Sequence, residues 1–202
     1  MIASIRSDMA IKRCRLFIYS ELASHIPFNS VRVFLLKWCG VEIGRNSVIH
    51  RNTVFSGGGG RVIIGDRVQI GPFTRFICSD GGVICIHDGV KIQAACLISA
   101  KNGSCIELHP NVNIAHFVSL QASSHHINTS LKAYSIAGAG RYEDITIGKG
   151  CWICAGAIIV TGVTIGEFSV VAAGAVVLKS CPSRSLLAGN PATIKKTYPL
   201  TD

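Results

Sequence analysis

The chain has 202 residues, of which 15% are charged and 49% are hydrophobic, and its formal net charge is +9. This length suits a single domain with a sizeable core. The low share of charged residues indicates long uncharged surfaces that are buried against sister subunits. The positive charge favours an anionic ligand, and nucleic-acid binding is disfavoured because no basic run is interleaved with aromatic residues.

The first segment, residues 1–40, lacks any repeat and is predicted to be helical. Apolar residues such as Leu16 alternate with basic ones such as Arg15, as in an amphipathic helix. A second short helix is predicted over residues 31–39. No apolar run approaches the ~20 residues needed to cross a bilayer. We interpret the segment as a cap over an open end of the fold, and a compatible alternative is a basic helix lying on the inner face of a membrane.

After Gly40, aliphatic residues recur every six positions, most regularly between residues 147 and 181. A strict period of six fits neither an α-helix nor a flat strand. It fits three short strands that close one triangular coil, with the first residue of each six pointing inward and stacking on the next coil about 4.8 Å away. Six coils are predicted, with the inward positions Ile43, Ile49, Phe55, Ile64, Ile70, Phe76, Ile86, Ile92, Ile98, Leu108, Ile114, Leu120, Ile147, Ile153, Ile159, Ile165, Val171 and Val177.

The spacing of the coils predicts one long loop. Successive coils begin 21, 22, 22, 39 and 18 residues apart, whereas an uninterrupted coil takes 18. The fourth step therefore contains a polar excursion over residues 123–144. Long excursions from a compact domain are usually functional, so this segment is where we expect the chemistry.

Three features together resemble a known family. The ladder over residues 147–181, Trp152 within it and the later segment Leu187–Ala192 (LAGNPA) resemble the hexapeptide-repeat acyltransferases, in particular their sugar and polysaccharide O-acetyltransferase branch. The resemblance implies an all-β fold, a left-handed parallel β-helix over residues 41–190, with a short C-terminal tail at 191–202.

The resemblance also implies an activity. Such a protein would be a homotrimer that transfers an acetyl group from acetyl-coenzyme A directly to a sugar hydroxyl, in the assembly of bacterial surface polysaccharide such as O-antigen or capsule. The different-class alternative is a non-catalytic scaffold. With no signal peptide visible, we expect a cytoplasmic protein whose thiols are reduced.

Two adjacent histidines open the long excursion. Acyl transfer to a hydroxyl requires a base, and histidine ionises near neutral pH. The resemblance places the catalytic base where a coil gives way to the loop, which is His125. Relatives commonly carry Asp next, but this chain has His126, so His126 is the second candidate. The group that orients the base is not identified, and the loop carboxylates Glu143 and Asp144 are expected to be exposed charges.

The resemblance further implies binding residues near the end of the prism. For the cofactor these are Ala155, Ala173, Gly174, Lys179, Lys195 and Lys196, and for the acceptor His116, Asn128, Tyr142 and Trp152. Where the sugar-acetylating branch has an Asn near the acceptor, this chain reads Ala94–Cys96. That departure leaves the acceptor open, and N-acetylation of a nucleotide-linked amino sugar is the runner-up.

Nine cysteines and seven histidines raise the question of a metal. Cys151 and Cys154 form a C-x-x-C pair, but they hold different positions of the repeat and no second pair has zinc spacing. His87 and His109 hold the same position in consecutive coils and should stack on one outer wall. With His116 they leave a zinc protein similar to the γ-class carbonic anhydrases as an alternative. We expect no metal.

Overall fold

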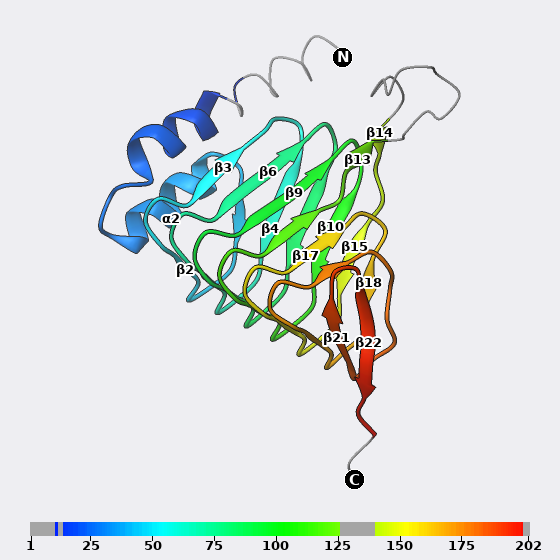
Figure 1. Ribbon diagram of the computed structural model, residues 1–202. Helices are drawn as coiled ribbons and strands as arrows, with labels where there is room; N and C mark the ends of the chain where they lie inside the picture. Colours follow the sequence, from blue (N-terminus) through cyan, green and yellow to red (C-terminus); the bar gives the residue numbers. More distant parts are fainter. Residues whose placement is uncertain (1–10, 12–13, 126–139, 200–202) are drawn as a thin grey trace, which may run out of the picture.

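The computed structural model describes residues 11, 14–125 and 140–199, and it shows a three-sided parallel β-helix (Figure 1). Three parallel sheets, called here walls A, B and C, run along the prism, and each coil contributes one strand to each wall. The left-handed parallel β-helix of six coils predicted from the sequence is therefore confirmed.

The strands are short, as the period of six requires. Wall A contains β1 (Glu42–Ile43), β4 (Arg61–Ile64), β7 (Val83–Ile86), β10 (Cys105–Leu108), β15 (Ile145–Ile147) and β18 (Thr164–Ile165). Wall B contains β2 (Val48–Ile49), β5 (Gln69–Ile70), β8 (Lys91–Ile92), β11 (Asn113–Ile114), β16 (Trp152–Ile153) and β19 (Val170–Val171). Wall C contains β3 (Val54–Ser56), β6 (Arg75–Ser79), β9 (Leu97–Lys101), β12 (Ser119–Gln121), β17 (Ile158–Val160) and β20 (Val176–Val177).

The core is a set of stacked aliphatic columns. All eighteen predicted inward positions are buried, none with more than 8% of its surface exposed. The register aligns them, since Ile86 pairs with Ile64 in the coil before and with Leu108 in the coil after. Because each coil repeats the same inward position, the sequence period determines both the core and the register.

The corners between walls need left-handed backbone. Residues with positive φ recur at the A–B corner (Asn46, Arg67, Gly89, Asn111, Gly150 and Phe168) and at the B–C corner (Asn52, Phe73, Ala95, Phe117, Gly156 and Gly174). Glycine and asparagine adopt this conformation readily, but bulky residues do so at a cost. Of the three phenylalanines at these corners, Phe73 and Phe117 are about two-thirds exposed and Phe168 is about half exposed.

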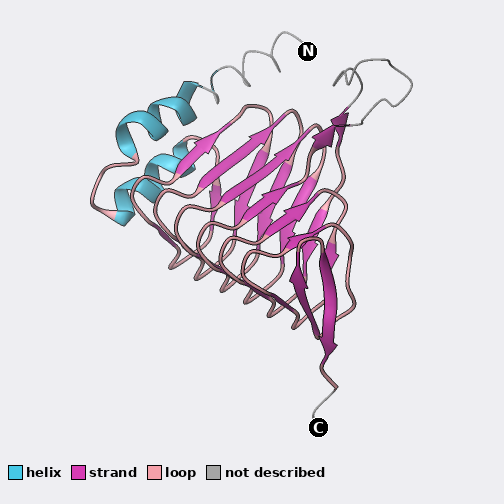
Figure 2. Ribbon diagram, in the orientation of Figure 1, coloured by secondary structure: helices cyan, strands magenta, loops and turns pink. Residues whose placement is uncertain are grey.

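Helices cover the open end of the first coil (Figure 2). Residues 14–18 are helical and lead into the one-turn π-helix η1 (Tyr19–Ala23), and α2 (Asn29–Trp38) follows. Tyr19 and Leu36 are buried beneath them. None of the helices in the described part of the chain is long and apolar enough to cross a membrane.

The helices also bind backbone groups of the first coil. The Ser20 hydroxyl donates to the Phe55 carbonyl at 3.0 Å and accepts from the Phe55 N–H at 3.3 Å. The Asn29 side chain accepts from the Ile49 N–H at 2.9 Å. The buried Arg32 guanidinium donates twice to the Ile49 carbonyl, at 2.9 and 2.7 Å. Side chains thus replace the neighbouring strand that this end of the prism lacks.

The other end of the prism finishes in a hairpin. β21 (Ser185–Gly189) continues wall B parallel to β19, and β22 (Ala192–Thr197) folds back antiparallel on β21. The segment expected to be a tail after Asn190 is therefore mostly a strand, which extends beyond the prism in Figure 1.

Candidate active site

His125 lies where the long excursion leaves the prism, at the edge between walls C and A. The chain leaves through β13 (Ser124–His125) and returns through β14 (Gly140–Arg141), and the two strands pair antiparallel with His125 opposite Gly140. The His125 side chain is exposed. His126 and Asn128 lie outside the described residues, so their assignments stay predictions.

Tyr142 belongs to the same stem. A Cβ at Gly140 would clash with the Tyr142 hydroxyl, so the phenol lies against the Gly140 backbone. Since Gly140 pairs with His125, the structure places a predicted acceptor residue in the same short hairpin as the predicted base.

Glu143 and Asp144 connect this stem to the prism. Arg141 donates to the Glu143 carboxylate at 2.6 Å, and this hydrogen bond raises the pKa of Arg141. The Glu143 backbone N–H and carbonyl both bind the Thr161 hydroxyl of the fifth coil, at 2.9 and 3.0 Å. The Asp144 carboxylate accepts from the Cys105 N–H at 2.7 Å. Glu143 and Asp144 are exposed, as expected, and each also has a structural partner. The group that orients His125 stays unidentified.

A second set of predicted residues lies along the B–C edge. His116, Ala155 and Ala173 hold equivalent corners in the last three coils, because Gly156 N–H donates to the His116 carbonyl and Gly174 N–H to the Ala155 carbonyl, each at 2.9 Å. A Cβ at Gly174 would meet nothing within 4 Å. The structure therefore brings the acceptor candidate His116 together with three cofactor candidates, Ala155, Ala173 and Gly174, along one edge, called here the backbone ridge.

Wall C separates His125 from the backbone ridge within one chain. Its outward positions in the last three coils are uncharged: Ser119, Gln121, Ile158, Val160 and Val176. The C–A edge with His125 and the B–C edge with the ridge border opposite sides of this wall. One subunit alone therefore does not join the predicted base to the predicted cofactor residues.

The remaining predicted residues are dispersed. Lys179 is exposed just after β20, on the C–A side. Trp152 is half exposed on wall B. Lys195 and Lys196 are exposed on β22, and the Lys196 ammonium lies 4.8 Å from the Tyr198 ring centroid. These four positions are compatible with ligand contact, and their roles stay predictions.

The cysteines show no activated nucleophile. All nine are free thiols. Burial raises the pKa of both Cys96 and Cys151 to about 11, so these thiols stay protonated near neutral pH. Cys151 donates to the Gly166 carbonyl, as expected of a small core residue. Acyl transfer through a cysteine thioester therefore has no support here.

The histidines predicted to stack on an outer wall do so. The His87 and His109 rings lie parallel on wall A with centroids 5.3 Å apart. His116 lies at the B–C corner instead, so one chain does not bring the three histidines together. Sequence reasoning missed that Cys85 and Glu107 lie beside this pair, although the equal 22-residue steps of these coils could have revealed it.

Comparison with known proteins identifies the repeat and the fold. The family model "Bacterial transferase hexapeptide (six repeats)" matches residues 144–179, which span the last two coils. No curated protein sequence matches the chain.

Solved structures share the architecture. The polysialic acid O-acetyltransferase OatWY has a TM-score of 0.68 at 23% identity, covering 78% of this chain and 74% of that one. A mutant of the N-acyltransferase AntD from Bacillus cereus, in complex with a nucleotide-linked amino sugar and coenzyme A, has a TM-score of 0.71 at 22% identity, covering 82% and 88%. A galactoside acetyltransferase in complex with coenzyme A has a TM-score of 0.60 at 23% identity, covering 96% and 82%. At sequence identities this low, the structural similarity establishes a shared fold and nothing further.

Proposed function

We propose that this chain, a β-helix protein built on the bacterial transferase hexapeptide repeat, is an acetyltransferase that moves an acetyl group from acetyl-coenzyme A to a sugar hydroxyl. The observation that carries the proposal is the position of His125, an exposed imidazole in the stem of the long excursion. The three solved structures of the same fold support it, since all are acetyl- or acyltransferases and two of them contain coenzyme A.

A homotrimer would complete the site. When three prisms surround a threefold axis with wall C facing inward, rotation brings the C–A edge of one chain against the B–C edge of the next. His125 of one subunit would then face the backbone ridge of its neighbour. The uncharged outer face of wall C in the last three coils favours this arrangement, because an interface core is depleted of charged residues.

The backbone ridge fits an extended thioester ligand. Gly156 and Gly174 have φ of +68° and +67°, and Ala155 and Ala173 add little side-chain volume, so a narrow chain could approach the main chain closely. Ala155, Ala173 and Gly174 would hold the pantetheine arm. Lys179, Lys195 and Lys196 would attract its phosphate groups, in keeping with the chain's positive net charge.

The protein carries one proton from the acceptor hydroxyl to the leaving thiolate. His125 removes the proton of the acceptor hydroxyl as its oxygen attacks the thioester carbonyl, and a backbone N–H holds the developing oxyanion. When the C–S bond breaks, the imidazolium returns the proton to the departing thiolate. A base of this kind contributes about 10²- to 10⁴-fold in rate.

The acceptor class rests on the relatives. OatWY is a polysialic acid O-acetyltransferase, and this supports a sugar hydroxyl in surface-polysaccharide assembly as the acceptor. The amino sugar bound to AntD supports the second candidate, N-acetylation of a nucleotide-linked amino sugar. His116 and Tyr142 border the two halves of the proposed site, so both would contact whichever acceptor binds.

The activity is tested by coenzyme A release with His125→Ala. We expect turnover to fall at least ~100-fold, because the base is lost while the binding residues remain. The assay screens sugars, sugar nucleotides and polysaccharide fragments as acceptors, and size-exclusion chromatography verifies an unchanged assembly.

The matched control is His50→Ala, which removes an exposed histidine from the first coil and should leave turnover unchanged. Retained activity in His125→Ala, or no acceptor that stimulates release by the unmodified protein, would refute the proposal.

Membrane contact through the N-terminal helices stays a prediction. Phe17, Leu22 and Phe34 are each about two-thirds or more exposed, at 66%, 72% and 69%. Such side chains favour an apolar partner such as a lipid surface. This contact would place the enzyme at the inner face of the membrane.

A further inference from the structure

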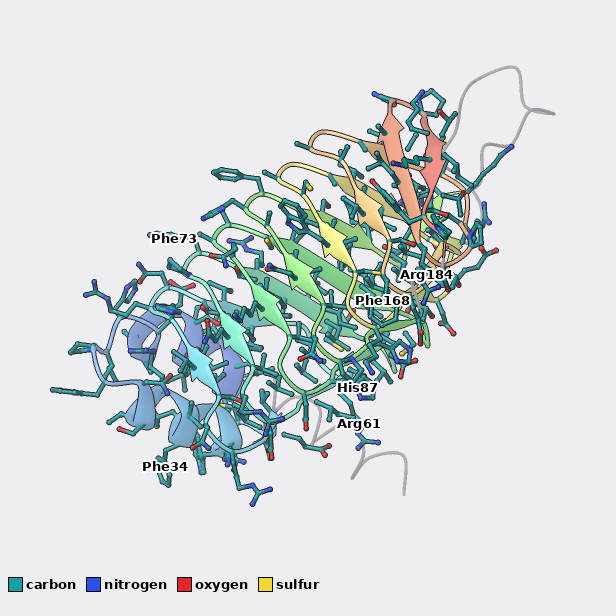
Figure 3. The ribbon with its side chains drawn as sticks, turned by 90° about the horizontal axis from the view of Figure 1, so that it is seen from below. Phe34, Arg61, Phe73, His87, Phe168 and Arg184 are labelled. Atoms are coloured by element: carbon teal, nitrogen blue, oxygen red, sulfur yellow. The ribbon has the colours of Figure 1, made fainter. Side chains whose placement is uncertain are left out.

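Wall A presents four potential metal ligands on its outer face. Cys85 lies in β7 and pairs in register with Glu107 of β10, so their outward side chains are neighbours across adjacent coils. His87 and His109 follow two residues later in the same two coils. Figure 3 labels His87 on the surface formed by the coils.

The donor atoms are close together. His87 Nε2 lies 2.8 Å from Glu107 Oε1 and 3.7 Å from Cys85 Sγ. All three donor atoms lie within 4.8 Å of one another. A tetrahedral zinc ion with Zn–N of about 2.05 Å and Zn–S of about 2.3 Å places nitrogen and sulfur about 3.6 Å apart. The Cys85 sulfur and the His87 nitrogen therefore already lie at the spacing that zinc requires, and the His87–Glu107 hydrogen bond would open to about 3.3 Å when the ion binds.

The surroundings favour a cation. The His87, Glu107 and His109 side chains are 38%, 37% and 37% exposed, so the cluster is partly shielded from water yet open to an ion. The charged groups that act on the Cys85 thiol are the carboxylates of Glu107 and Glu42. Glu42 is itself paired with Arg61 at 2.9 Å, which leaves Glu107 as the anionic donor of the cluster.

We propose that Cys85, His87 and Glu107 bind one zinc ion per chain, with water as the fourth ligand. Thiolate, imidazole and carboxylate are the ligands zinc takes in proteins, and a divalent hard cation such as Mg²⁺ would not select a thiolate. His109 stacks on His87 and would fix the orientation of that ring.

The site would join two coils below the excursion. Cys85 and His87 belong to the third coil and Glu107 to the fourth, and Asp144 at the end of the excursion binds the same strand through Cys105. Zinc would therefore stabilise the coils that support the stem of His125. The proposal stands on wall A alone and does not depend on the acetyltransferase assignment.

The test uses the full-length protein after chelation. Isothermal titration calorimetry should show one Zn²⁺ bound per chain. In thermal unfolding, Zn²⁺ should raise the melting temperature. Co²⁺ should give a thiolate-to-metal charge-transfer band, which a histidine-only or adventitious carboxylate site would lack.

Matched variants separate this cluster from general surface binding. Cys85→Ala and His87→Ala should each weaken Zn²⁺ binding at least ~10-fold and Cys85→Ala should abolish the cobalt band. Cys105→Ala removes the neighbouring thiol of the same wall and should keep both signals. Absence of stoichiometric binding, or an effect of Cys105→Ala in place of Cys85→Ala, would overturn the proposal. Circular dichroism of each metal-free variant excludes misfolding as the cause.

Discussion

At the scale of single residues, the helical cap buries a phenol beside a guanidinium. Tyr19 is 2% exposed and Arg32 is 4% exposed. The Tyr19 hydroxyl is buried without a hydrogen-bond partner among the residues that the structure describes. Burial raises the pKa of Tyr19 far above its ordinary value, which the charge of Arg32 offsets only in part. The fold therefore holds this phenol in its neutral form and gains nothing from its hydroxyl.

Tyr19→Phe should stabilise the protein by about 1 kcal/mol at pH 7, because it removes an unsatisfied buried hydroxyl. The unfolded chain releases the phenol proton near pH 10, whereas the folded chain keeps it. Stability of the unmodified protein therefore falls above pH 10, by up to about 1.4 kcal/mol per pH unit, and the variant should avoid this loss.

Urea unfolding at pH 7 and at pH 10.5 measures both effects. Tyr198→Phe, at a residue that is 39% exposed, is the control and should change stability little at either pH. A clear loss of stability in Tyr19→Phe at pH 7 would show that the hydroxyl has a partner after all.

At the scale of elements, the corners explain how a two-residue strand can be followed by a sharp turn. Each A–B and B–C corner uses one left-handed residue, and in most coils this residue is not glycine. Ala95 holds the B–C corner of the third coil with φ of 59°, where an L-residue is strained by roughly 1–2 kcal/mol. Its neighbour Ala94 is not in this conformation. The two alanines therefore form a matched pair.

Ala95→Gly should raise stability by about 0.5–1 kcal/mol, because relief of the strain exceeds the entropy cost of glycine. Ala94→Gly should lower stability by about 0.5–1 kcal/mol, since it bears the entropy cost alone. Thermal unfolding of both variants provides the comparison. Equal destabilisation by the two substitutions would contradict this account of the corner.

At the scale of the whole molecule, the proposed site consists of two halves on opposite edges of wall C. The stem of His125 occupies the C–A edge, and the ridge of His116, Ala155 and Ala173 occupies the B–C edge. If the halves meet between subunits, two inactive variants should restore each other's activity in mixed trimers.

Co-expression of His125→Ala with Ala173→Trp tests this. The first variant lacks the base, and the second fills the ridge with a bulky exposed side chain, so each alone should be inactive. In randomly mixed trimers, a site has both intact halves about one time in four, so activity should return to about a quarter of normal. A site contained within one chain would show no restoration.

Much of the fold could be predicted because the core is periodic. Eighteen inward positions, six coils and the long excursion all follow from one residue type recurring at a fixed interval, and the register of each coil is inherited from the last. The stacking of His87 on His109 followed from the same reasoning. A buried position that recurs in every coil accepts only apolar residues, so its period is visible in the sequence.

The outward and terminal features could not be predicted in the same way. Outward positions tolerate many residue types, so nothing in the pattern singled out Cys85 and Glu107, although their 22-residue spacing matches that of His87 and His109. The repeat stops after residue 181, which hid the strand β22 and its antiparallel pairing. The division of the candidate site between two edges depends on which corner each residue occupies, and that required three dimensions.

The side chains that bind the first coil also limit assembly. The first coil of this prism has strand edges that no other strand pairs, and such edges can serve as a template for another chain's strand, as in amyloid growth. Ser20, Asn29 and Arg32 already bind the groups that an incoming strand would need. End-to-end polymerisation at this end would first have to displace them, so the helices protect the first coil against growth by added strands.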